Sequence, residues 1–369
     1  MTYIDLKKTL SAWISELKQP IRLEQSSETS ISPQKSERDE TFDVLKGLAI
    51  IFVILAHSDT GALRTFINSF HMPLFFFIAG FFLKIRPLRE EIKLSIKRLI
   101  FPYIFVSASI CFSAFINDLS NYALTDGSHT QSVIITHLWG FWGESIPHWT
   151  TGHISILWFI LAMFWARILC VFILKKIKSV SILCTFFFIT SILGIFLTKC
   201  SFIPFCIPQG LAATGFIFTG YLIKKFRLMQ ISNMKLFFPI LFILWLYCLN
   251  RGNLAMVSSS YPAGYIWGLL GALGAFFALD IIVKNLYRKE SIIWKIVLFA
   301  GRYSLVIYCV HAIESIIINW KDFCLLHQIP LKYLASIEIS ARIIIAIVFT
   351  IIILKIKPLR EGIFQIRTI

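Results

Sequence analysis

Apolar runs long enough to cross a lipid bilayer recur along this sequence from Thr41 to near its C-terminus. A bilayer core about 30 Å thick requires about 20 residues of helix, and lipid offers an open backbone no hydrogen-bond partners. We therefore expect an all-α fold, a polytopic membrane helical bundle with about ten transmembrane helices. The spans are predicted at 42–59, 66–83, 99–117, 154–174, 179–198, 208–223, 236–249, 262–283, 299–320 and 333–354.

The composition leaves little length for a soluble domain. Apolar residues make up 57% of the chain and charged residues 15%, whereas soluble domains average about 45–50% and about 25%. We expect a cytoplasmic tail with an amphipathic helix and a linker at 1–40, a transmembrane domain at 41–355 and a second cytoplasmic tail at 356–369. The first apolar run follows a polar stretch, so it predicts an internal anchor rather than a cleaved signal peptide.

Segments rich in Lys and Arg alternate along the chain with segments that contain few of them. The net charge is +16, and with the N-terminus inside, 27 of the 36 Lys and Arg residues fall in cytoplasmic segments. This distribution follows the positive-inside rule, so both termini are expected in the cytoplasm. We therefore interpret the net positive charge as a signal of membrane topology. The expected partner is the lipid bilayer and not nucleic acid. The cations of the outer segments are Arg64, Lys199, Arg251, Lys321 and Lys332.

The cysteines predict no metal site, because no pair has the spacing of metal ligands. Most of them lie within apolar runs, where Cys behaves as a small hydrophobe. Cys200 and Cys206 lie in one connection and could form a disulfide if that side of the membrane is oxidising.

The first predicted span carries ionisable side chains on one face. Lys46 and His57 are eleven residues apart, which places them within about 20° of each other and about 16 Å apart along a helix. Asp43 lies on nearly the same stripe. Ionisable groups cost at least about 2.5–3.5 kcal/mol at the membrane centre, so these residues are candidates for function. The structural alternative is that Lys46 extends to the inner interface and His57 lies at the outer one.

Two other predicted spans add polar groups. His71 opens the second span and is expected at the same outer level as the first-span histidine. In the ninth span, Ser304, Tyr308, His311 and Ser315 have the spacing of one helical face.

Two remaining charged groups have simpler interpretations. Glu338 and Arg342 are four residues apart in the tenth span and predict a structural ion pair within the membrane. Arg167 lies near the inner end of the fourth span, where its long side chain is expected to extend toward the interface.

The outer segment 118–153 is longer than a simple connection requires. It contains no Lys or Arg but is rich in Trp and His. It is interpreted either as a surface loop with an aromatic belt or as a lid over a site for an extracytoplasmic, sugar-like substrate.

The order of several motifs resembles the acyltransferase 3 family of bacterial membrane proteins. The similarity extends from about residue 38 to 355. Each motif is short, but their order together with ten predicted spans is specific. The motifs are Asp43 to Gly47 with His57, Phe70 to Gly80, Lys97 to Tyr103, Leu157 to Phe159, and Gly301 to His311.

This resemblance implies a multi-pass enzyme of the bacterial cytoplasmic membrane. Members transfer an acyl group, usually acetyl, from cytoplasmic acyl-coenzyme A to a hydroxyl of a glycan or another envelope molecule. The form without an added soluble domain is similar to sugar O-acetyltransferases of the fucose 4-O-acetylase group. The family signature of a basic residue, ten residues and a histidine falls here on Lys46 and His57. Ala79 stands where many members have Ser, so we assign no role there.

A mechanism consistent with the resemblance uses the donor acetyl-coenzyme A or another acyl-coenzyme A, and no metal. The nucleotide end is expected to dock on Lys97 and Arg98, and the pantetheine arm to pass Lys46. His57 then acts as a general base or as an acyl carrier, and sequence does not separate the two. The expected catalytic residues are His57, Lys46 and Asp43, supported by His71, Tyr308 and His311.

Two other classes of protein share parts of this pattern. A transporter or flippase of an envelope lipid or polysaccharide precursor would also have many spans with buried polar groups, although the halves show no clear internal repeat. A membrane sensor would need an output domain, for which the short cytoplasmic loops leave no room. The acceptor sugar, the acyl chain length and the oligomeric state are left open.

Overall fold

The computed structural model describes residues 40–58, 60–120, 127–138, 155–200, 203–230 and 234–366. The predicted tail helix and linker lie outside the described residues, and so do residues 121–126 and 139–153 of the long outer segment and the side chain of Cys200. The amphipathic tail, the lid and the Cys200–Cys206 disulfide therefore stay predictions.

The described residues form helices joined by short connections, and they include no β-strand. This agrees with the all-α prediction. The α-helices are α2 (Glu40–Ala56), α3 (Ala62–Asn68), α4 (His71–Phe81), α5 (Leu88–Ser95), α6 (Phe101–Ser120), α8 (Ser128–Leu138), α9 (Trp158–Lys176), α10 (Val180–Cys200), α11 (Ile207–Lys225), α12 (Met234–Arg251), α13 (Tyr265–Leu286), α14 (Ile292–Arg302), α15 (Ser304–Ile317), α16 (Trp320–Leu326) and α17 (Leu334–Lys355).

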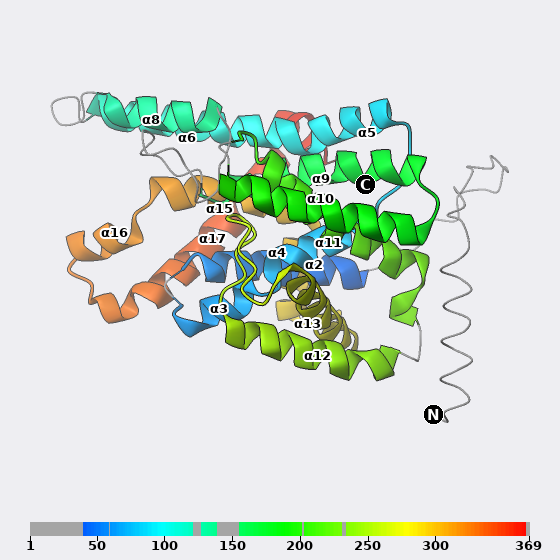
Figure 1. Ribbon diagram of the computed structural model, residues 1–369. Helices are drawn as coiled ribbons and strands as arrows, with labels where there is room; N and C mark the ends of the chain where they lie inside the picture. The colour runs from blue at the N-terminus through cyan, green and yellow to red at the C-terminus, as the bar shows by residue number, and fades with distance from the viewer. Residues whose placement is uncertain are drawn as a thin grey trace.

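Helices α2, α4 and α11 form the middle of the bundle (Figure 1). Helix α2 packs along α14 and α4, and α11 packs against α4, α9 and α10. Helices α12 and α13 cover one side of this middle layer, and α5, α6 and α9 lie on the other. The α2 helix is therefore enclosed along its length, which places the residues of its polar stripe inside protein.

Five described helices are long and apolar enough to cross a membrane, and the number becomes six if the bent pair α14–α15 counts as one span. They include Leu88–Ser120, a continuous helix of 33 residues that covers α5, α6 and the π-helical turn between them. The other predicted spans correspond to helices that are shorter or less apolar, such as α2 with 17 residues. A count of about ten spans stays a prediction.

The second predicted span, 66–83, is not a single helix. The chain folds as α3 and α4, which meet at Ser69 and Phe70. Pro73 explains the break, because it occupies the first turn of α4, where the missing backbone N–H has no helical partner to lose.

The ninth predicted span, 299–320, is also broken. Helices α14 and α15 meet at Tyr303 with a bend of 83°. A glycine two residues before the bend lets α14 lie close to α2. Gly301 packs so closely on the backbone of α2 that an added Cβ would overlap the Asp43 carbonyl oxygen. Small residues permit such close helix contacts in membranes. The bend then sends α15 across the end of α2 toward α6 and α17.

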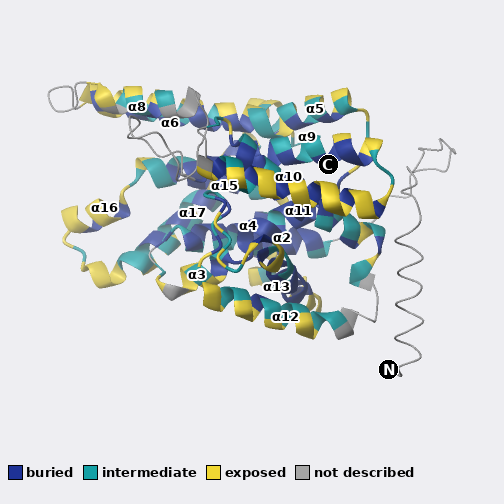
Figure 2. Ribbon diagram, in the orientation of Figure 1, coloured by how far each residue is buried: buried dark blue, intermediate teal, exposed yellow. Residues whose placement is uncertain are grey.

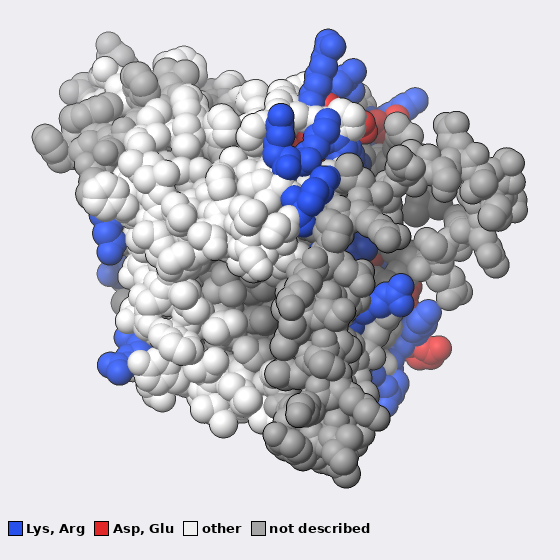
Figure 3. Space-filling model, turned by 45° about the vertical axis from the view of Figure 1, so that its right-hand side comes forward, with Lys and Arg blue, Asp and Glu red and all other residues white. Residues whose placement is uncertain are grey.

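The outward faces of the bundle are apolar. Figure 2 shows exposed residues on the outer faces of α6, α10 and α12, and these include Phe112, Ile189 and Ile243, which are 66%, 60% and 64% exposed. Figure 3 shows a broad surface without charged side chains, with Lys and Arg at its margins. Exposed apolar area on this scale marks an interaction surface, and a lipid bilayer fits both the area and the position of the cations.

Candidate functional site

The two side chains of the predicted polar stripe, Lys46 and His57, line two different pockets. Lys46 lines one pocket, which also contains Arg98 and is called here the basic pocket. His57, just after the C-terminal end of α2, lines a second one, called the histidine pocket. Their positions on α2 put Lys46 and His57 about 16 Å apart along its axis. The two residues thus face two separate cavities in this conformation, with the side chains of α15 between them.

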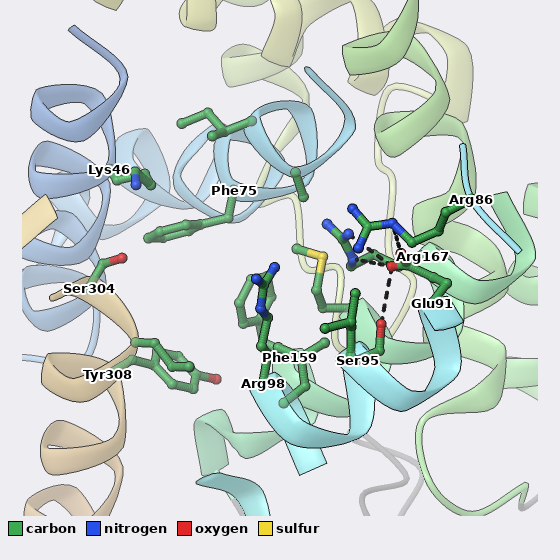
Figure 4. Close-up of a pocket in the computed structure, with 16 residues that line it drawn as sticks. Lys46, Phe75, Arg86, Glu91, Ser95, Arg98, Phe159, Arg167, Ser304 and Tyr308 are labelled. Atoms are coloured by element: carbon green, nitrogen blue, oxygen red, sulfur yellow. Dashed lines mark hydrogen bonds and ion pairs between the residues drawn. The ribbon is translucent and has the colours of Figure 1, made fainter. Parts of the chain in front are cut away.

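The basic pocket has a volume of about 240 Å³ and combines cations with apolar walls. Its only acidic lining residue among the described residues is Glu91, so its charge is strongly positive (Figure 4). The remaining lining residues are Lys46, Phe75, Ile78, Ala79, Arg86, Leu94, Ser95, Arg98, Leu99, Phe159, Met163, Arg167, Ser304, Leu305 and Tyr308.

A buried carboxylate organises one wall of the basic pocket. Glu91 is 1% exposed and accepts hydrogen bonds from Arg167 Nη2 and Nε at 2.9 and 3.1 Å. Arg86 Nε lies 3.4 Å from its second oxygen, and Ser95 Oγ lies 3.2 Å from the first. Two guanidinium groups are therefore held in fixed positions at the pocket (Figure 4).

Arg167 pairs with Glu91 on α5, a partner that the sequence analysis did not predict. Sequence reasoning also missed Glu91 and Arg86, which it placed in a cytoplasmic loop. A signal was present: Glu91, Ser95 and Arg98 have i, i+4, i+7 spacing, which is typical of one helical face.

The predicted donor residues separate in the structure. Arg98, in the π-helical turn Ile96–Ile100, lines the basic pocket and forms no ion pair with a described residue. Lys97 does not line the pocket and is exposed. Lys46 reaches the pocket from α2 and pairs with the buried Asp43 at 2.7 Å. Asp43 thus holds the lysine and does not itself line the pocket.

Tyr308 is a residue of the basic pocket alone. It lines the basic pocket from α15, and its hydroxyl donates a hydrogen bond to the backbone oxygen of Ile156. Its ring packs edge-on against Phe159, with centroids 5.6 Å apart. The hydroxyl is committed to the backbone, so this structure does not place it against His57.

His57 contacts a second histidine, His311, which is buried and does not itself line the histidine pocket. The rings of His57 and His311 are edge-to-face, with centroids 5.5 Å apart. His57 Nδ1 lies 2.7 Å from the backbone oxygen of Val53. Because a carbonyl only accepts, Nδ1 carries the proton, and the neutral imidazole keeps a lone pair on Nε2. His57 is therefore oriented as a base or nucleophile.

His311 has a carboxylate partner. Its Nδ1 lies 3.1 Å from Glu314 Oε2, and its buried Nε2 has no hydrogen-bond partner among the described residues. Glu314 Oε1 accepts a hydrogen bond from Trp320 Nε1. A carboxylate on one ring nitrogen fixes the orientation of the other, so His311 presents Nε2 in a defined position one turn beyond Tyr308.

Arg342 connects these histidines to α17. Its Nη2 lies 2.6 Å from Glu338 and its Nε 3.4 Å from Glu314, while Nη1 donates to the backbone oxygen of His57 at 2.7 Å. The predicted ion pair of Glu338 and Arg342 is present, and it belongs to a larger network. The sequence analysis did not predict that this ion pair contacts His57, because residue spacing within α17 gives no information about contacts between α17 and α2.

The histidine pocket has a volume of about 500 Å³. Its lining is polar, in contrast to that of the basic pocket. The lining residues are His57, Ser58, Arg64, Ser315, Ile316, Ile318, Asn319, Trp320, Lys321, Leu334, Glu338 and Arg342.

His71 does not line either pocket. It is 5% exposed, and its Nδ1 donates to the backbone oxygen of Ile67 at 2.9 Å. That bond joins α3 to the first turn of α4 across the break between them. Groups of His, Cys, Asp and Glu able to hold a metal ion are absent from the described part of the chain.

Comparison with known proteins adds one finding. The family model described as an acyltransferase domain matches residues 39–355, which covers nearly the whole chain and every helix that lines the two pockets. No curated protein and no solved structure matches the chain.

The Arg342 network predicts that Arg342→Lys destabilises the protein. An ammonium group cannot reproduce the three directions of the guanidinium, and a buried acceptor left without its donor costs about 1–3 kcal/mol. We expect a lower unfolding temperature in detergent than for the parent protein. Arg360→Lys, at a less buried ion pair with Glu361, is the matched control. Equal unfolding temperatures for the parent and Arg342→Lys would contradict the network's structural role.

Proposed function

The chain belongs to the acyltransferase 3 family of membrane proteins, and from this premise we propose that it transfers an acyl group, most simply acetyl, from acyl-coenzyme A to a sugar hydroxyl. The acceptor is a glycan or glycolipid of the cell envelope on the other side of the membrane. The family match favours this reaction over transport or sensing. The observation that carries the proposal is the pairing of a basic pocket and a histidine pocket at the two ends of one enclosed helix.

The basic pocket supports binding of the donor. Coenzyme A ends in phosphates, for which Arg and Lys supply charge and hydrogen bonds. Arg98 is free of ion pairs with described residues and can meet a phosphate at the pocket, while Arg86 and Arg167 are held in place by Glu91. The apolar walls from Phe75, Phe159 and their neighbours suit a thin pantetheine arm, and the volume of about 240 Å³ is small for a nucleotide.

The wall between the pockets must open during transfer. The two pockets share no lining residue, so Lys46 and His57 face separate cavities in this conformation. The thioester therefore reaches His57 only when the part of α15 around Tyr308 moves, and such gating motions accompany many enzymatic reactions. A closed wall also keeps water away from the thioester between turnovers.

His57 carries the chemical step in this proposal. Its Nε2 removes the proton from the acceptor hydroxyl, the hydroxyl oxygen forms a bond to the thioester carbonyl carbon, and the carbon–sulfur bond breaks. The departing thiolate takes the proton from His57, so coenzyme A leaves as a thiol and the ester is the product. The same Nε2 could first accept the acyl group as an acyl-imidazole. His311 lies behind His57 and lines neither pocket. In the proposal, its protonated Nε2 donates a hydrogen bond to the negatively charged oxygen of the intermediate.

Loss of the base predicts loss of transfer. We expect His57→Ala, in a preparation with parental unfolding temperature, to transfer label from acetyl-coenzyme A about 100-fold or more slowly, since a positioned general base contributes about 10²–10⁴-fold. His327→Ala, an exposed histidine outside both pockets, should keep the parent rate. Transfer by His57→Ala at the parent rate would show that the base assignment is wrong.

The basic pocket predicts a selective donor effect. Arg98→Gln should raise the KM for acetyl-coenzyme A about ten-fold, because a hydrogen bond to a charged group contributes about 1.5–3 kcal/mol. Lys97→Gln is the matched control, since it removes the neighbouring charge from outside the pocket. Initial rates across donor concentrations measure both. Equal effects of the two substitutions would indicate general surface charge and not a phosphate contact in the pocket.

A further inference from the structure

Two cations that line the histidine pocket take no part in the ion pairs among Arg342, Glu338 and Glu314. Arg64 and Lys321 line the pocket from α3 and α16, and both are exposed. Neither forms an ion pair with a described residue. Arg342, the third cation, is different, because it is buried and shared between Glu338 and Glu314. The pocket therefore carries positive charge that no carboxylate of the described chain neutralises.

These two cations are unusual for the side of the bundle on which His57 lies. In the predicted topology, five of the 36 Lys and Arg residues fall in the outer segments, as the positive-inside rule favours. Two of those five, Arg64 and Lys321, line the one described pocket that contains His57. Of the others, Arg251 and Lys332 lie over the tyrosine rings of Tyr247 and Tyr333. Topology does not require a cation at this pocket, so a ligand is the better explanation.

The surroundings of the two cations are those of a polar ligand site. Trp320 lines the same pocket and its indole N–H is occupied by Glu314. Ser58 and Ser315 add hydroxyl groups to the lining, and these donate to the backbone oxygens of Ile54 and Ala312. The volume of about 500 Å³ is within the range of about 300–1,000 Å³ of small-molecule sites. A monosaccharide unit with a charged substituent fits these properties.

We propose that the acceptor is an anionic sugar, whose carboxylate or phosphate lies between Arg64 and Lys321 while one of its hydroxyls reaches His57 Nε2. This inference rests on the proposed function and narrows its acceptor class. Attraction between the cations and the anionic group brings the acceptor to the pocket and fixes which hydroxyl faces the base. Because the cations are exposed, added salt should weaken the effect.

The test compares matched acceptors with the full-length protein in nanodiscs of zwitterionic lipid. Each sugar of a pyranoside panel is supplied as the neutral methyl glycoside, as the corresponding uronic acid and as the 6-phosphate. Acetyl transfer from labelled acetyl-coenzyme A gives kcat/KM for each acceptor. We expect kcat/KM at least about ten-fold higher for one anionic form than for its neutral counterpart, and a smaller difference in high salt.

The variant Arg64→Gln/Lys321→Gln should lose this preference, so that its kcat/KM for the anionic form falls to that for the neutral glycoside. The double control Arg251→Gln/Lys332→Gln removes the same charge from outside the pocket and should keep the preference. Equal use of neutral and anionic acceptors by the parent would overturn the inference while the proposed function stands.

A preference for the anionic acceptor that survives the Arg64 and Lys321 substitutions would also overturn the inference. The two cations would then bind lipid phosphates or contribute to membrane topology. Transfer to neither class of acceptor would overturn the proposed function as well.

Discussion

Charged groups inside a lipid-embedded bundle must be neutralised by other groups of the protein, and the position of Arg342 depends on this constraint. Its guanidinium is held by Glu338 and Glu314, and it holds the backbone oxygen of His57 in return. The same Glu314 orients His311. One buried cation therefore ties the end of α2 to α15 and α17 and fixes the spacing of the two histidines.

The opposite end of the bundle uses the same principle with the charges reversed. Glu91 is the buried group there, and Arg86 and Arg167 neutralise it. The result is a basic pocket with fixed cations, whereas the other end has a polar pocket lined by His57, whose backbone oxygen Arg342 holds. In the proposed mechanism, the ion pairs hold each end in place while the side chains of α15 around Tyr308 move. Under the proposed function, an acyl group would pass from the basic pocket to the histidine pocket without a permanent opening through the membrane.

The sequence predicted the helical class, the polar stripe of α2 and the two ends to which Lys46 and His57 belong, because these follow from hydrophobicity and helical periodicity. It did not predict the break at Phe70 or the bend at Tyr303, where Pro73 and close glycine packing override apolar continuity. Contacts between helices that are distant in the sequence also could not be predicted, because hydrophobic periodicity describes one helix at a time. The partners of Arg167 and Arg342 are examples, and both depend on tertiary packing.

The central claim is that donor and acceptor occupy different pockets at opposite ends of α2. The most direct measurement uses proteoliposomes with labelled acetyl-coenzyme A outside and the acceptor sugar sealed inside. Our account predicts labelled, acetylated sugar in the lumen while acetyl-coenzyme A stays outside. Transfer that occurs only when donor and acceptor share one compartment would contradict it.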